Sequence, residues 1–378
     1  MKTAKALASV VVVFLLGAVY FVNYTAIPDP IPEFTVAGKL VAAENAGFET
    51  EVVTLVDSSR ATNANGDYAG SDQREFEVQV WYPKTRAEAG PLLVYSHGFT
   101  SNGEGGEYMA QKLADLGYVV AAPTFPLTNM QAPGGPNAAD VANQPGDVSF
   151  VIDTLLERNA DANDVLYQSI DADKIGAMGV SLGGMTTTLV AYHPGMSDER
   201  IRAAVSIAGP TYLFTKRFFD RRELPFMMVA SPQDALIPYD DNAANIRDKI
   251  PGSILVTIGG GSHTGFSTPS RWLRWMRNPD SLGCAAVMDS VDLEDEEGWY
   301  HLLGDDSMGV LSPEPPDMCS ADPLPRTINP IRQQEITMVA VYQFFQCQFL
   351  QEKASRGFAC GYLKNDLERE VFGVSVDV

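Results

Sequence analysis

Histidine and cysteine are scarce in this chain, which has 378 residues and only four of each. The cysteines all lie in its C-terminal part, at Cys284, Cys319, Cys347 and Cys360, and no two are close in sequence. Without a close pair or a histidine cluster, the spacing excludes the common zinc motifs, so we expect no metal site. In an exported protein an even number of cysteines indicates disulfides, and four cysteines allow three pairings. We predict nearest-neighbour pairing, Cys284 with Cys319 and Cys347 with Cys360.

The chain has fewer basic than acidic residues. Lysine and arginine number 27 against 48 aspartates and glutamates, so the formal net charge is −21 and the isoelectric point is near 4.5. An acidic surface repels both nucleic acids and anionic membranes. The composition therefore argues against both as partners and is typical of a soluble, exported protein.

Long apolar runs are also rare, and the clearest one lies at the N-terminus. It extends from Ala6 to Val22 and follows Lys2 and Lys5, a pattern that indicates export. No cysteine follows the run, which argues against a lipoprotein. Residues 1–26 are therefore either a cleaved signal peptide or an uncleaved membrane anchor. The residues around the possible cleavage sites do not distinguish between these two interpretations. The protein is expected to be periplasmic or extracellular, or anchored with its domain outside.

The rest of the chain divides into a lead-in and one domain. Residues 27–49 begin with three prolines in six residues and are expected to form a linker. In residues 50–378, two early strands are expected at 51–56 and 74–82, joined by a polar loop. Apolar strands then alternate with helices, which predicts an α/β fold with a mostly parallel sheet and helices on both faces. We expect strands at 92–96, 118–122, 174–180, 203–207, 226–230 and 254–258, and helices at 107–116, 148–157, 185–192, 242–249 and 331–350.

A Gly-x-Ser-x-Gly turn lies between one of these strands and the helix after it. It consists of Gly179, Ser181 and Gly183. Strand, sharp turn and helix are the context of a nucleophile elbow, in which a strained serine is exposed above the sheet. The glycines remove Cβ atoms that would clash in so tight a turn. We therefore interpret Ser181 as a nucleophile.

The loop after strand 92–96 has the sequence His97-Gly98-Phe99-Thr100. In an elbow enzyme this loop supplies one backbone N–H of the oxyanion hole, and the residue after the nucleophile supplies the other. We assign these donors to Phe99 and Leu182. His97 precedes the nucleophile and lies in the oxyanion loop, so we interpret it as a structural hydrogen-bonding residue and not as the base.

An acid and a base follow two later strands. Asp234 comes a few residues after strand 226–230, where the acid of a catalytic triad belongs, with Asp240 and Asp241 as alternatives. His263 follows strand 254–258 in a glycine-rich loop and is the predicted base. The other histidines fit less well, because His193 ends the nucleophile helix and His301 lies in an acidic segment.

Together these motifs resemble the α/β-hydrolase superfamily over roughly residues 50–350. More narrowly, the chain resembles the branch that includes dienelactone hydrolase, platelet-activating-factor acetylhydrolase and cutinase-like esterases. The shared marks are residues 80–83, 96–99, 179–184, 231–234 and 262–263. Dienelactone hydrolase itself uses a cysteine nucleophile, so Ser181 argues against dienelactone as the substrate.

These residues predict a serine hydrolase that cleaves a neutral, small-molecule or lipid-like ester through an acyl-serine, with no cofactor. A thioesterase, amidase or peptidase could use the same triad. A non-catalytic binding protein on this scaffold is a second class, although the intact triad argues against it. The acyl group, the alcohol and the oligomeric state are not indicated by the sequence.

Residues 270–326 are expected to be an insertion before the last core helix. The segment carries aromatic residues among acidic ones: Trp272, Trp275, Trp299 and Tyr300. So long a connection with little clear secondary structure is unusual unless it is functional or disordered. Two interpretations remain open, a lid or pocket wall that shapes the acyl site and an acidic decoration on the outer helices.

Overall fold

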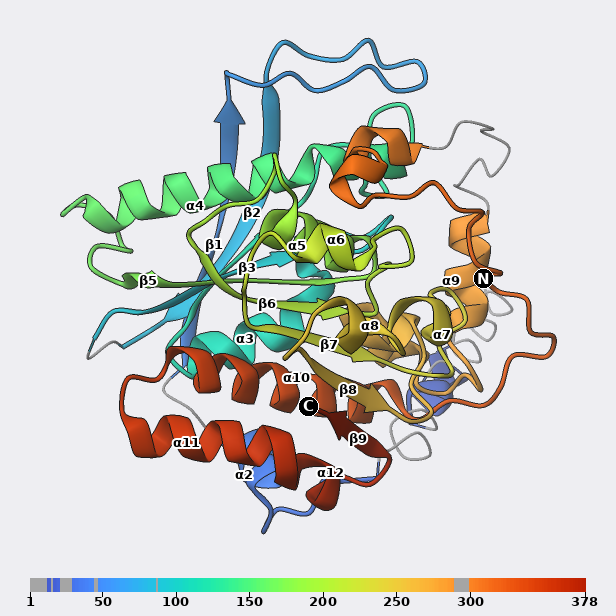
Figure 1. Cartoon of the computed structure of the whole chain (residues 1–378). Coiled ribbons are helices and arrows are strands. Elements are labelled where there is room, and N and C mark those ends of the chain that lie inside the picture. Colours follow the sequence, from blue (N-terminus) through green and yellow to red (C-terminus); the bar gives the residue numbers. More distant parts are fainter. Residues whose placement is uncertain (1–11, 15, 21–28, 44–46, 86–87, 289–298) are drawn as a thin grey trace, which may run out of the picture.

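A nine-stranded sheet forms the frame of the protein, as the computed structural model shows (Figure 1). The structure describes residues 12–14, 16–20, 29–43, 47–85, 88–288 and 299–378. The strand order is β1-β2-β4-β3-β5-β6-β7-β8-β9. The strands are β1 Phe48–Asp57, β2 Arg74–Pro83, β3 Gly90–Ser96, β4 Val119–Pro123, β5 Ile170–Val180, β6 Ile201–Ile207, β7 Phe226–Ala230, β8 Ile254–Ile258 and β9 Val374–Asp377.

The six central strands, from β4 to β8 in the sheet, are parallel, and the strands at both edges are antiparallel. Parallel strands need crossover connections, which place helices on both faces and bury the strands completely. Strands β4 and β7 are accordingly buried at every residue. The predicted fold class, an α/β-hydrolase fold with a mostly parallel sheet, is confirmed.

Helices cover the sheet from two sides (Figure 1). They are α2 Val36–Ala42, α3 Glu107–Asp115, α4 Gln144–Ala160, α5 Leu182–Tyr192, α6 Lys216–Phe219, α7 Tyr239–Asn242, α8 Ile246–Lys249, α9 Asp280–Met288, α10 Pro330–Phe349, α11 Lys353–Gly361 and α12 Leu367–Glu370. Helices α3 and α10 lie on one face, whereas α4 and α5 lie on the other.

Alternating strand residues supply the two core layers, because successive side chains of a strand point to opposite faces. Leu93 packs in the layer with α3 and α10, and its neighbour Leu92 packs in the layer with α4.

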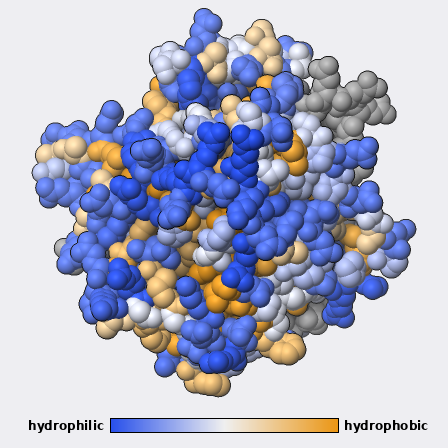
Figure 2. Space-filling model, viewed as in Figure 1, coloured by the Kyte–Doolittle hydropathy of each residue, from blue (hydrophilic) through white to orange (hydrophobic). Residues whose placement is uncertain are grey.

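On the outside of the molecule, hydrophilic side chains cover most of the face seen in Figure 2, with apolar residues scattered between them.

Three elements differ from the prediction. The expected linker contains α2, whose Val36 N–H donates to Glu370 Oε2 at 2.9 Å near the C-terminus. The single helix expected at 242–249 is replaced by the short helices α7 and α8. The last strand is not β8 but β9, which has four residues and lies antiparallel at the edge of the sheet. Elements this short depend on tertiary contacts more than on their own sequence pattern.

Both predicted disulfides are present. Cys284 is bonded to Cys319, and Cys347 is bonded to Cys360. The first lies in the predicted insertion, and the second joins α10 to α11. Two disulfides indicate an oxidising compartment.

Most of the predicted signal or anchor, residues 1–26, lies outside the described residues. Within the part of the chain that the structure describes, no helix has both the length and the apolar character needed to cross a bilayer.

Candidate active site

Ser181 lies at the turn between β5 and α5 with φ 57° and ψ −124°. This positive φ is unusual for a residue with a side chain and is the strain expected of a nucleophile elbow. A Cβ at Gly179 would come within 2.2 Å of the Gly183 carbonyl oxygen, and one at Gly183 within 2.0 Å of the Ser96 carbonyl oxygen. Only glycine therefore fits at either position, as the motif predicted. Ser181 itself remains half-buried and accessible.

Two backbone N–H groups near Ser181 have no acceptor among the described residues. They belong to Phe99, in the loop after β3, and to Leu182, the first residue of α5. The loop passes close to the elbow, since a Cβ at Gly98 would lie 3.2 Å from Ser181 Cβ. Backbone donors are rarely left unpaired in a protein interior. Both predicted oxyanion donors are thus available to a ligand atom at Ser181.

Asp234 and His263 form a buried pair. His263 Nδ1 lies 2.8 Å from Asp234 Oδ2, and the two side chains are almost completely buried. The other oxygen, Asp234 Oδ1, accepts the N–H groups of Leu236 at 2.9 Å and Ile237 at 2.8 Å. The carboxylate is therefore held by its own loop and directs Nδ1–H of His263, which leaves Nε2 as the nitrogen that can accept a proton.

Burial alone would lower the pKa of His263. The charge and hydrogen bond of Asp234, together with the charge of Asp280, outweigh that effect and raise its pKa above the ordinary value. Nearby negative charge stabilises the imidazolium. The site therefore favours a histidine that takes up a proton.

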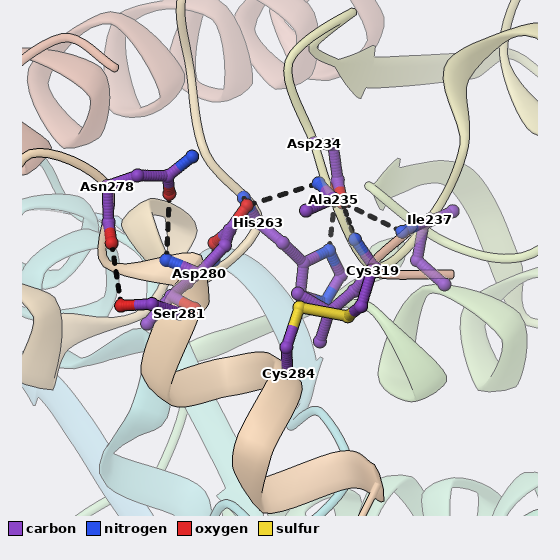
Figure 3. Close-up of a disulfide and its surroundings, with 11 residues drawn as sticks. Asp234, Ala235, Ile237, His263, Asn278, Asp280, Ser281, Cys284 and Cys319 are labelled. Carbon is purple, nitrogen blue, oxygen red and sulfur yellow. Dashed lines mark hydrogen bonds and ion pairs between the residues drawn. A yellow bond between two sulfur atoms is a disulfide. The ribbon is translucent and has the colours of Figure 1, made fainter. Parts of the chain in front are cut away.

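Asp280 is a functional candidate that the sequence analysis missed. It is the first residue of α9 and is completely buried. Its Oδ2 accepts the N–H of His263 at 2.9 Å and that of Ala235 at 3.1 Å, and its Oδ1 accepts the N–H of Thr264 at 2.7 Å. Figure 3 shows this carboxylate between the loops of Asp234 and His263. One side chain thus holds both loops, although no motif marks it.

The Cys284–Cys319 disulfide lies beside the same loops (Figure 3). Cys284 is one helical turn after Asp280 on α9. Cys319 N–H donates to the carbonyl oxygen of Ala235 at 2.6 Å, next to Asp234. The disulfide therefore connects the helix that carries Asp280 to a segment that is hydrogen-bonded to the loop of Asp234.

Ser181, Asp234 and His263 follow β5, β7 and β8, which are parallel strands of one sheet. Their carboxyl ends meet at one edge, where ligands bind in open α/β sheets. Among the described residues, no hydrogen bond joins Ser181 Oγ to His263. Such contacts are often long in structures without substrate.

A comparison with models of protein families gives one match, which covers residues 50–271 and is described as PETase, PET hydrolase-like. The match spans more than half of the chain and includes Ser181, Asp234 and His263. The chain belongs to the PET hydrolase-like family. It is accordingly an enzyme of the ester-hydrolase type.

A solved structure supports the fold of this PET hydrolase-like chain. It is a ferulic acid esterase from Streptomyces cinnamoneus, 18% identical in sequence, with a TM-score of 0.52. The likeness covers 84% of this chain and 97% of the esterase. No curated protein sequence matches the chain. The predicted resemblance to the esterase branch of the α/β-hydrolases is confirmed.

His97 has the structural role that was predicted in this PET hydrolase-like chain. It is completely buried, and its Nδ1–H donates to the Gly98 carbonyl oxygen at 2.7 Å. Its Nε2 accepts the N–H of Phe125 at 3.0 Å. Burial lowers the pKa of His97 to about 4, partly offset by the bond to Gly98. Both ring nitrogens of His97 are thus occupied by backbone partners, and the lone pair of Nε2 is not available to take a proton from Ser181.

The remaining candidates lie away from the Asp234–His263 pair. His193 is also a structural residue, since its Nε2 donates to the carbonyl oxygen of Leu303 at 2.8 Å and its Nδ1 accepts the N–H of Gly195 at 3.0 Å. The alternative acids Asp240 and Asp241 are exposed on α7. Asp234 is thus the only one of the three predicted acids that contacts His263.

The predicted insertion divides into parts with different surroundings. Trp272 and Trp275 are 77% and 60% exposed. Trp299 and Tyr300, in a 3₁₀ helix from Trp299 to Leu303, are partly buried against an apolar cluster that contains Leu182 and is bordered by Phe99. The acidic run 292–297 lies outside the described residues. The later aromatics therefore lie in the layer next to the nucleophile, and the earlier ones do not.

Proposed function

We propose that this PET hydrolase-like protein is a serine carboxylic ester hydrolase that acts through an acyl-serine intermediate. The observation that carries the proposal is the buried hydrogen bond of 2.8 Å between Asp234 and His263, at the sheet edge where Ser181 is strained. A buried carboxylate that orients a histidine at the same edge as an elbow serine has the roles of a catalytic triad.

In the first step, His263 Nε2 takes the proton of Ser181 Oγ as the oxygen attacks the ester carbonyl carbon. Asp234 keeps the proton on Nδ1 and stabilises the imidazolium. The tetrahedral intermediate collapses when the imidazolium gives its proton to the leaving alcohol. Water, activated by the same histidine, then attacks the acyl-serine and releases the acid. No cofactor takes part in these steps.

The N–H groups of Phe99 and Leu182 bind the developing oxyanion. Backbone donors fixed before the reaction stabilise this charge without reorganisation, which is usually the largest electrostatic contribution. Since Leu182 begins α5, the positive end of that helix adds to the effect.

The substrate is a neutral ester. The net charge of −21 disfavours an anionic one. The family description and the structural neighbour name a PET hydrolase and a ferulic acid esterase, so esters with an aromatic acid are the first class to test. Trp299 and Tyr300 are proposed to form an apolar wall of the acyl site, on the same side as Phe99 and Leu182.

Two alternatives use the same residues. A thioesterase, amidase or peptidase would follow the same steps with another leaving group, and a binding protein would lack turnover. The apolar cluster beside Leu182 favours an uncharged, apolar acyl group in either case.

The test is turnover of p-nitrophenyl esters of graded acyl size and of a terephthalate diester. Ser181→Ala should fold normally and lose nearly all turnover, on the order of 10⁶-fold, because a lost nucleophile disables the whole triad. An organophosphate probe should label the parent protein and not the variant. Retention of more than a few per cent of activity would contradict the assignment.

In the same panel of esters, Trp299→Ala should weaken turnover of bulky esters more than that of acetate esters.

The two disulfides and the N-terminal sequence together support an exported enzyme. We propose that the domain works outside the cytoplasm, with residues 1–26 acting as a signal peptide or as an anchor.

A further inference from the structure

A cavity of about 1150 Å³ lies at the edge of the sheet, next to the end of β8 and the start of β9. It is formed by segments that are distant in sequence: the lead-in before α2, the residues after the 3₁₀ helix Thr268–Leu273, the start of α10 and the end of α12. Gly259 and Gly373 form its floor, where the Gly259 N–H donates to the Gly373 carbonyl oxygen at 2.7 Å.

Four arginines line this cavity: Arg274, Arg277, Arg326 and Arg332. Among the described residues that line it, two are carboxylates, Asp29 and Glu370. Oε2 of Glu370 already accepts the N–H of Val36 and the hydroxyl of Tyr362. The cavity is therefore locally cationic in a chain whose net charge is −21.

Three of the four arginines have no salt-bridge partner among the described residues. These are Arg277, Arg326 and Arg332. Nη1 of Arg332 is buried and has no hydrogen-bond acceptor there. Buried polar groups are nearly always hydrogen-bonded, so such an atom indicates a missing partner. Burial lowers the pKa of Arg332, and the more distant charges of Glu335 and Asp29 only partly offset it.

The chemistry of the missing partner follows from the cavity lining. Guanidinium groups bind phosphate and carboxylate oxygens through paired N–H donors, and several arginines in one cavity favour a group with more than one negative charge. Two aromatic side chains also line the cavity, Trp275 at 60% and Phe372 at 95% exposure. Exposed aromatics beside cationic residues are typical of contact with the interface of a lipid bilayer.

We propose that this cavity is a binding site for a phosphate group, supplied either as free phosphate or as the headgroup of an anionic lipid. The arginines hold the phosphate oxygens, and Trp275 and Phe372 contact the apolar part of a lipid when one is bound. The general repulsion between an acidic protein and phosphates is reversed locally at this cavity. None of Ser181, Asp234 and His263 lines this cavity.

The first arm of the test is calorimetric titration of the full chain with inorganic phosphate. Arg277→Gln with Arg326→Gln removes two exposed guanidinium groups and should weaken binding about tenfold or more, since charge-assisted hydrogen bonds are lost. The matched control is Arg217→Gln with Arg356→Gln, which removes the same charge from exposed positions outside the cavity lining. Arg332→Gln should also weaken binding, and its thermal unfolding reports whether the half-buried position tolerates the change.

The second arm measures co-sedimentation of the full chain with vesicles of phosphatidylcholine alone or with added phosphatidic acid. If the headgroup is the source, phosphatidic acid increases binding, and only the cavity double variant loses the increase. If free phosphate is the source, only the calorimetric arm responds to the cavity variants. The proposal is overturned if neither arm detects binding. It is also overturned if the cavity and control variants bind equally well in both arms. Ester turnover by the double variant should stay at the parental level, which separates this result from a failure of the proposed hydrolase function.

Discussion

At the scale of single residues, the active-site candidates differ in how they could be recognised. Ser181 is marked by its own neighbours, because the glycines on either side are needed for the turn. Asp234 and His263 are marked by their places after two strands. Asp280 has no local mark, since it is one of many acidic residues in the chain and its three partners lie in other loops. Its role depends entirely on how α9 packs.

Replacing Asp280 by Asn should change the pH profile of ester hydrolysis. The proposed base is neutral His263, so turnover should fall as the pH drops through its pKa. Removal of a negative charge that raises this pKa should extend activity to lower pH. The asparagine side chain has only one acceptor oxygen, so at least one of the loop N–H groups that Asp280 holds loses its acceptor. The kcat should therefore also fall, by up to about 100-fold for a misplaced base.

The measurement is kcat/KM against pH on a neutral p-nitrophenyl ester. Asp240→Asn, an exposed change nearby on α7, is the control and should match the parent protein. A purely structural role for Asp280 would reduce kcat/KM by the same factor at every pH and leave the acid limb of the profile at its parental pH.

At the scale of elements, the two disulfides have different surroundings. Cys284–Cys319 connects α9 to a segment that is hydrogen-bonded to Ala235, beside the proposed catalytic acid. Cys347–Cys360 joins the C-terminal end of α10 to α11. Spacing along the chain predicted both pairs, but only the packing of α9 shows that one of them lies beside the loops of Asp234 and His263.

Removal of each disulfide by a pair of serines should therefore have separable effects. Both pairs should lower the free energy of unfolding, by roughly 2–4 kcal/mol for a native disulfide. The Cys284→Ser and Cys319→Ser pair should in addition lower kcat well below the transition temperature, because the acid and base loops lose their connection. Each pair serves as the control for the other, with kcat and thermal unfolding as the two readings. Equal kcat in both would show that the first disulfide does not position the loops.

At the scale of the whole molecule, a buried ionic cluster joins the antiparallel strand β2 to helix α4 and to the 3₁₀ helix before it. Arg74 of β2 is completely inaccessible and binds Asp147 of α4 through Nε at 2.6 Å and Nη2 at 2.7 Å. Its Nη2 also lies 2.7 Å from Asp140 Oδ2. Arg60, in the loop after β1, contacts Asp147 at 2.9 Å. Such a cluster needs every partner, since an unpaired buried charge is costly.

Arg74→Met should consequently destabilise the protein strongly. The change leaves two buried carboxylates without their main partner, and breaking a buried pair typically costs about 3–5 kcal/mol. The control is Lys84→Met, whose ion pair with Glu49 is exposed and 3.8 Å long, and which should change stability by less than about 1 kcal/mol. Urea unfolding at neutral pH compares the two variants. A similar loss in both would mean that the buried cluster adds no more than a surface ion pair.

Local sequence alone determines much of this protein: the strand–helix alternation, the glycines around Ser181, the order of Ser181, Asp234 and His263, and the pairing of cysteines that are near neighbours in the chain. These features depend on residues a few positions apart or on periodicity, which the backbone geometry translates directly into structure. Tertiary structure alone decided the rest. β9 is too short to be recognised and exists because β8 presents an unpaired edge. Asp280 reaches residues 17 and 45 positions away. The arginine cavity gathers side chains from four segments whose proximity only the folded chain creates.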